Sequence, residues 1–214
     1  MGKFNDGIFG AFSGRVGNVV GASWRDMDVL RKRPRRKKQD PSEKQMEQRL
    51  KFAEVAKFLN PIKEVVGAYF GRTEKSKSRF NLATSYHLKN AVVPAPDGTY
   101  LIDYPRVMIS RGELRGMEEG TIQAAANHVL QVTWADNSGQ GSAAGTDLLV
   151  VVVYESDGQF FSIYNPAGTR NEATKAITMP AYYFGKEVHV WAAFVSADKK
   201  VSSISTYLGH VTAQ

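Results

Sequence analysis

The feature that most constrains the fold is a change of hydrophobic period near residues 94–98. Before it, apolar residues recur at helical spacing, whereas after it they alternate with polar residues as in β-strands. Between the two lies Pro94-Ala95-Pro96-Asp97-Gly98, which is rich in turn-forming residues. We therefore predict a domain boundary here, with a helical segment over 42–93 and a β domain over 99–214.

The part of the chain after this boundary contains seven stretches with the composition of short strands. Turn sequences such as Asp157-Gly158 and Asn165-Pro166 separate them. This alternation of short strands and turns predicts a seven-stranded, all-β sandwich of the immunoglobulin or fibronectin-III kind, without the cysteine pair of antibody domains. The predicted strands are Leu101–Ser110, His128–Trp134, Leu148–Glu155, Gln159–Tyr164, Ala173–Thr178, Glu187–Ser196 and Val201–Leu208.

The helical segment begins with a recognisable start signal. Ser42-Glu43-Lys44-Gln45 matches a capping box, in which the serine and glutamine cap each other's backbone. Asn60-Pro61 then predicts either a kink or a second helix that begins at the proline, and Gly71 is suited to end that helix. Ser78 is suited to cap a third helix that extends to Ala91. An apolar stripe at helical spacing consists of Phe52, Val55, Leu59, Ile62 and Val66.

Residues 1–41 form a glycine-rich, β-like arm followed by a basic linker. Valines, Trp24 and Leu30 supply strand formers, and glycines supply bends or points of close backbone approach. Two interpretations are open: a hairpin with Trp24–Leu30 as its second strand, or an arm that orders on assembly. The predicted fold class is therefore α+β: a β-like arm, a basic linker, short helices and a β-sandwich.

The positive charge is concentrated in the first half of the chain. Residues 1–100 contain 20 Lys+Arg and 10 Asp+Glu, a charge of +10, whereas residues 101–214 contain 8 and 11, a charge of −3, which add to the total of +7. Much of this charge lies in the basic run between Arg31 and Lys38. A run of this kind can neutralise nucleic-acid phosphates, contact an acidic neighbouring subunit, or remain a solvated loop. The basic residues that we select for such a contact are Arg31, Lys32, Arg33, Arg35, Arg36, Lys37 and Lys38.

The sequence does not indicate catalytic chemistry. It contains no cysteine, and its four histidines lack metal-ligand spacing, so we expect no metal and no cofactor. The glycine-rich stretch 139–145 lies between two predicted strands and opens no helix, unlike a phosphate-binding loop. No apolar run approaches the roughly 20 residues of a membrane helix, and the N-terminus lacks the apolar region of a Sec signal peptide. We expect a cytoplasmic or virion location and no membrane insertion.

Two motifs resemble a known family. The first is Gly10-Ala11-Phe12-Ser13-Gly14-Arg15-Val16-Gly17-Asn18-Val19-Val20, and the second joins Arg33-Pro34 to Pro41-Ser42-Glu43-Lys44-Gln45. Together they resemble an uncharacterised domain family known mainly from Bacteroidota, and the likeness continues through Trp134 and Ser196-Ala197-Asp198. This resemblance implies no assigned activity. The basic-Pro element followed by Pro41, Gln45, Arg49 and Phe52 in the order Pro-x-x-x-Gln-x-x-x-Arg-x-x-Phe is also similar to a short motif in some phage and prophage structural proteins.

Three functions remain open on these grounds. The first is a non-enzymatic structural subunit of a self-assembling, virion-like or other particle, a homo-oligomer that displays the β-sandwich. Its subunit contacts are predicted at Ile8, Phe9, Phe12, Val16 and Val19. The second is a nucleic-acid-binding protein that uses the basic residues between Arg31 and Lys38. The third is a carbohydrate- or protein-binding adhesin module, with an aromatic platform at Tyr182, Tyr183 and Phe184.

Overall fold

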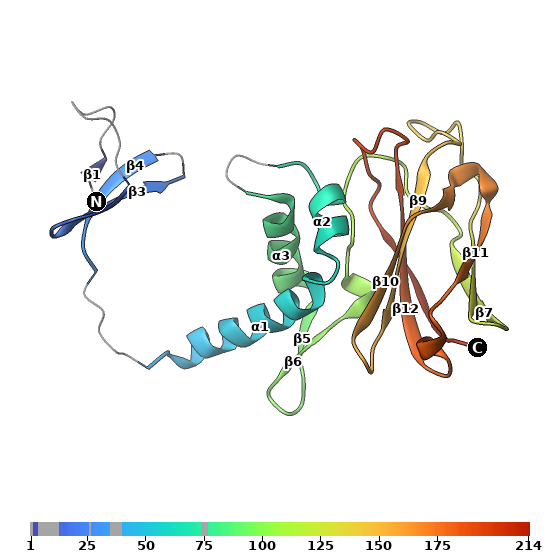
Figure 1. The fold of residues 1–214 in the computed structure, drawn as a ribbon, viewed down its shortest axis with the longest axis horizontal. Coiled ribbons are helices and arrows are strands. Elements are labelled where there is room, and N and C mark those ends of the chain that lie inside the picture. The colour runs from blue at the N-terminus through green and yellow to red at the C-terminus, as the bar shows by residue number, and fades with distance from the viewer. Residues whose placement is uncertain (1, 4–12, 26, 35–39, 74–76) are drawn as a thin grey trace. The chain divides into compact units, whose positions relative to one another are not determined.

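A computed structural model describes residues 2–3, 13–25, 27–34, 40–73 and 77–214 (Figure 1). The protein is a mixed α+β protein in which strands predominate over helices. It divides into two compact units, residues 1–45 with 74–76, and residues 46–73 with 77–214. The first contains the predicted arm, and the second contains most of the helical segment and all of the β domain.

The first unit is a small antiparallel sheet. Its strands are β1 (Gly2–Lys3), β2 (Gly14–Val16), β3 (Val19–Trp24) and β4 (Met27–Lys32), in the order β1-β4-β3-β2. Gly17 turns the chain between β2 and β3 with a φ of +57°, a conformation that glycine adopts without steric cost. The β-like character predicted for this part of the chain is thus confirmed for its described residues.

The helices begin and end close to the predicted signals. They are α1 (Glu43–Leu59), α2 (Lys63–Tyr69) and α3 (Arg79–Asn90). The Ser42 N–H donates to Gln45 Oε1 at 3.3 Å, and Ser78 Oγ accepts from the Asn81 N–H at 3.2 Å. The predicted helix start at Pro61 is wrong by two residues, because Ile62 is the N-cap of α2 and the Asn60 carbonyl accepts from Lys63.

The second unit contains two larger sheets and one hairpin. The four-stranded sheet has the order β10-β9-β12-β13, the three-stranded sheet has the order β11-β8-β7, and every pairing in both is antiparallel. A separate hairpin joins β5 (Val92–Pro94) to β6 (Tyr100–Ile102), and its turn contains most of the predicted boundary segment at 94–98. The strands of the two sheets are β7 (Thr121–Ala125), β8 (Val129–Thr133), β9 (Leu148–Glu155), β10 (Phe160–Thr169), β11 (Thr174–Thr178), β12 (Glu187–Val195) and β13 (Thr206–Thr212).

The four-stranded sheet is covered on both faces, which makes the second unit a three-layer structure. One face of β9 and β12 packs against the helices through Val150, Val152 and Trp191, whereas Val151, Val153 and Val190 face the three-stranded sheet. Figure 1 shows the helices on one side of β10, β9 and β12, with β11 and β7 on the other. Two apolar cores therefore share the same central strands.

Three strand predictions require correction. Leu101–Ser110 is not a continuous strand, because β6 ends at Ile102 and a 3₁₀ turn follows at Tyr104–Arg106, where Pro105 cannot donate a ladder hydrogen bond. The last strand, β13, begins five residues later than the predicted start at Val201. Strand β7 was not predicted, and it pairs with β8 as an edge strand of the three-stranded sheet.

A buried ion pair connects the loops at one end of the sheets. Arg170 Nε lies 3.0 Å from Asp147 Oδ2, and both side chains are almost completely buried. The Arg170 guanidinium also donates to Asn137 Oδ1 and to the Arg115 carbonyl, and it stacks 3.9 Å from the Phe194 ring centroid. Burial of a charge is tolerated when its hydrogen bonds are satisfied in this way.

Within the part of the chain that the structure describes, no helix has both the length and the apolar character needed to cross a bilayer.

Candidate functional site

The arm sheet presents two faces that its register defines. Residues directly opposite each other on paired strands point to the same face. Arg15 pairs with Val20, and Val20 pairs with Arg31, so these three residues form one cross-strand row. Val16, Val19 and Lys32 form the neighbouring row on the opposite face. Each face therefore combines valine side chains with positive charge.

Neither face of this sheet forms a core with the described residues of its own unit. Val29, 4% exposed, is the sole buried apolar side chain among them. Val16 is 63% exposed, and Trp24 is 48% exposed with the Arg25 guanidinium 4.8 Å from its ring centroid. A small sheet is stable when an apolar face is covered, and the described residues of the arm leave such side chains exposed.

A basic groove lies beside the turn between β2 and β3. Its volume is about 780 Å³, and its lining includes Arg15, Asn18, Arg31, Lys32 and Arg33. The Arg33 N–H donates to the Asn18 carbonyl at 2.9 Å, which fixes the start of the linker against this turn. Four basic residues therefore line the groove, although the register places the Lys32 side chain on the face opposite to Arg15 and Arg31.

The structure describes some of the predicted contact residues. Val16 and Val19 are opposite each other on one face of the arm, whereas Ile8, Phe9 and Phe12 lie outside the described residues. Arg31, Lys32 and Arg33 line the basic groove, whereas Arg35, Arg36, Lys37 and Lys38 also lie outside the described residues.

Two groove residues were missed by sequence reasoning. Arg15 and Asn18 join the basic groove through the pairing of β2 with β3. Sequence reasoning did not include them in the basic site because they lie far from the Arg31–Lys38 run in the sequence. The signal that could have found them is the Gly17-Asn18 pair, because two residues of this type between strand formers are typical of a hairpin turn.

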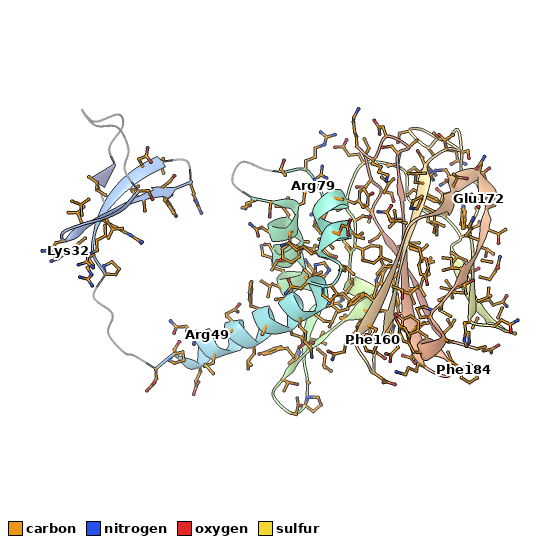
Figure 2. All side chains as sticks on the ribbon, viewed as in Figure 1. Lys32, Arg49, Arg79, Phe160, Glu172 and Phe184 are labelled. Atoms are coloured by element: carbon orange, nitrogen blue, oxygen red, sulfur yellow. The ribbon has the colours of Figure 1, made fainter. Side chains whose placement is uncertain are left out.

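The predicted aromatic platform is incomplete, because Tyr183 is fully buried and cannot contribute to a surface. Its hydroxyl hydrogen-bonds Ser162 Oγ at 3.0 Å, and burial raises the pKa of Tyr183 to about 12. Tyr182 and Phe184 are exposed, and Phe160 joins Tyr182 in an edge-to-face contact with ring centroids 5.6 Å apart. Figure 2 labels Phe160 and Phe184 on the second unit.

A cluster of titratable groups lies on β12 and β13. His189 is buried, its Nδ1 is 2.9 Å from the Tyr207 hydroxyl, and its Nε2 is 3.4 Å from Glu187 Oε1. Burial lowers the pKa of His189 more than the nearby Glu187 carboxylate raises it. His189 therefore lies within β12 with a contact at each ring nitrogen. Among the described residues, no group of His, Asp and Glu side chains is arranged to hold a metal ion.

The fold and these surfaces define a mostly β, mixed α+β protein with a basic N-terminal sheet. A family model described as a family of unknown function, DUF6266, matches residues 11–209. The chain belongs to this family, which confirms its assignment to an uncharacterised domain family. The match extends from the arm into β13, so the arm and the three-layer unit are both part of the family's domain. A search of curated proteins found no match.

Proposed function

We propose that the protein is a non-enzymatic structural subunit of a self-assembling, virion-like or similar particle, and that its arm forms the contacts between subunits. The observation that carries this proposal is the arm sheet, whose described residues expose apolar side chains on both faces. The second unit differs, because it contains two cores of its own. A sheet without a core is suited to pack on another copy of the chain.

The charge distribution supports contacts between copies. The first hundred residues carry +10 and the remainder −3. Attraction between such surfaces accelerates association and sets its register, although each exposed ion pair contributes only about 0–1 kcal/mol. Burial of the predicted apolar contact residues, at about 25 cal/mol per Å² of apolar surface, would provide most of the affinity; these residues are Ile8, Phe9, Phe12, Val16 and Val19.

Removal of residues 1–40 should therefore convert an oligomer into a monomer. The double variant Val16→Ser/Val19→Ser should weaken association at least about tenfold, because about 1.4 kcal/mol corresponds to one decade. The measurement is size-exclusion chromatography with light scattering over a concentration series. A matched control is Leu101→Ser/Phe184→Ser, which changes two exposed apolar residues of the second unit and should leave the mass unchanged. A full-length chain that stays monomeric at high concentration would refute the proposal.

The two larger sheets support the finer fold assignment, a sandwich of the immunoglobulin or fibronectin-III kind. If β7 to β13 are numbered one to seven, the sheets contain strands five-two-one and four-three-six-seven. Seven antiparallel strands divided in this way, with Trp134 between the sheets, are typical of such sandwiches. The fourth strand pairs with the third, whereas the immunoglobulin constant type places it beside the fifth, which favours the fibronectin-III kind. The helical layer is an addition to this fold.

A second candidate function, binding of nucleic acid, is favoured by the basic groove. Arg15, Arg31, Lys32 and Arg33 line it together with the amide-bearing Asn18, a composition suited to phosphate contacts. Binding by such a surface depends on salt and not on sequence. The same cations cannot fully pair with an acidic subunit and with phosphates at once, so the two functions make different predictions.

If the groove binds nucleic acid, Arg31→Gln/Lys32→Gln/Arg33→Gln should weaken binding uniformly across sequences. It should also reduce the slope of log K against log salt by about 0.9 for each phosphate that the protein no longer neutralises. The measurement is fluorescence anisotropy with duplex and single-stranded probes. The control Lys89→Gln/Arg106→Gln/Lys175→Gln makes the same charge change in the second unit and should leave the slope unchanged. Absence of binding to both probes at low salt would eliminate this function.

A further inference from the structure

A cavity of about 210 Å³ lies in the second unit. Three segments that are distant in the sequence form its walls: the end of α2 with the start of α3, residues 111–113, and residues 200–202. Figure 2 labels Arg79, the first residue of α3, beside α2. The fold thus brings these segments together at one end of the helical layer.

Positive side chains converge on this cavity. Arg72, Arg79, Arg111 and Lys200 line it, and Glu113 is the single carboxylate among the lining residues. With Asp198, which pairs with Lys200, four cations and two carboxylates leave an excess of two positive charges. Like charges that converge from different segments repel each other, so a negative ligand would stabilise this arrangement.

The ion pairs at the cavity are weak. Arg72 Nη2 lies 2.9 Å from Glu113 Oε2, but both side chains are more than 70% exposed. Lys200 Nζ lies 3.2 Å from Asp198 Oδ2, and these side chains are also exposed. Exposed pairs of this kind contribute little to stability, so a bound anion can replace the carboxylate.

The two remaining arginines retain unused hydrogen-bonding capacity. One Arg79 Nη donates to the Ala68 carbonyl, but its Nε is buried without a partner among the described residues. Within the same ranges, no ion pair or hydrogen bond of the Arg111 guanidinium is found. The Arg111 side chain is exposed, so its guanidinium N–H groups are open to a bound acceptor, whereas the buried Arg79 Nε adds positive charge to the wall.

Backbone contacts hold the walls of the cavity in place. The Arg111 N–H donates to the Tyr69 carbonyl at 3.0 Å, and the Gly71 N–H donates to the Arg111 carbonyl at 2.6 Å. Ser202 Oγ donates to the same Tyr69 carbonyl at 2.8 Å. A Cβ at Gly112 would lie 2.0 Å from the Ser202 carbonyl oxygen, so the walls approach as closely as glycine permits. The cavity is therefore preformed.

We propose that this cavity binds an oxyanion group, either a phosphate or a carboxylate. A guanidinium presents parallel N–H donors that match the oxygen spacing of both groups, and two arginines from different segments define one site. The volume is smaller than the roughly 300–1,000 Å³ typical of drug-sized ligands, so the ligand is a small anion or one charged group of a larger molecule.

The test is isothermal titration of the full-length chain with inorganic phosphate and, separately, with succinate, at constant ionic strength maintained with chloride. At least one of the two should bind saturably with a Kd of about 1 mM or tighter, and the stronger ligand identifies the class of anion. Arg111→Gln should weaken binding about tenfold, as expected for loss of one charge-assisted hydrogen bond. Arg111 is suited to this test because its guanidinium makes no hydrogen bond or ion pair with the described residues, so its replacement should leave the fold intact.

The control Arg106→Gln removes an exposed arginine away from the cavity and should bind like the unchanged chain. Circular dichroism verifies that both variants remain folded. The proposal is overturned if neither anion binds more tightly than chloride, or if Arg111→Gln and Arg106→Gln bind equally. Because the cavity lies in the second unit, a chain lacking residues 1–40 should retain this binding whether or not it assembles.

Discussion

Replacement of Asp147 by alanine is expected to lower the free energy of unfolding by about 3–5 kcal/mol, because it leaves a buried guanidinium without its counter-charge. Asp147 Oδ2 accepts from Arg170 Nε at 3.0 Å and from the Ala144 N–H at 2.9 Å. The Arg170 side chain is fully buried, so water cannot replace the lost carboxylate. The measurement is urea unfolding followed by circular dichroism.

Two further variants separate this effect from ordinary ion pairing. Lys175→Ala removes a partly exposed pair, in which Lys175 Nζ lies 2.9 Å from Glu172 Oε2, and should cost about 0–1 kcal/mol. Asp147→Ala/Arg170→Met removes both buried charges and should be less destabilised than Asp147→Ala alone. A change below about 1 kcal/mol in Asp147→Ala would show that Arg170 does not depend on this carboxylate.

The central strands were the most predictable part of the fold. The predicted strand Leu148–Glu155 coincides with β9, and Glu187–Ser196 ends one residue after β12. Both segments are nearly continuous apolar runs, a pattern that reflects burial on both faces. The sequence therefore contained a sign that a third layer covers the sheet, although alternation alone suggested a two-layer sandwich.

The edges of the β region were less predictable. Strand β7 includes Gln123 and two alanines, which are weak strand formers, and its formation depends on pairing with β8. The segment after Ile102 has apolar residues at strand spacing, but Ile109 and Arg111 pair with other parts of the chain through serine hydroxyls and single bridges. Contacts between residues distant in the sequence, such as these, leave no recognisable pattern in the local sequence.

The candidate sites also differ in how much of each could be predicted from the sequence. The charge of residues 31–33 was evident from the sequence, whereas the contribution of Arg15 to the groove required the strand register. The cavity at Arg79 and Arg111 was not predicted, because its walls come from three distant segments. Burial of Arg170 likewise has no local signature, since arginine is usually exposed.

Two buried tryptophans allow a direct test of whether the helices and the sheets unfold together. Trp191 lies in the core shared with the helices, where its ring centroid is 6.1 Å from that of Phe58 and its Nε1 donates to the Tyr104 carbonyl at 3.3 Å. Trp134 lies between the two sheets, 6.0 Å from Phe194, and its Nε1 donates to the Arg170 carbonyl at 2.7 Å. Each change to alanine should cost about 3–5 kcal/mol, as is usual for a large buried aromatic residue.

We expect both variants to shift one common transition, because β9 and β12 contribute to both cores and neither layer can lose its partner without exposing them. The measurement is denaturant unfolding followed in parallel by the far-ultraviolet signal of the helices and the near-ultraviolet signal of the aromatic residues. Coincident curves in Trp191→Ala and Trp134→Ala would identify residues 46–214 as one cooperative unit. If Trp134→Ala instead left the helical transition in its original place, the helices would unfold independently, and the boundary predicted at residues 94–98 would separate two folding domains.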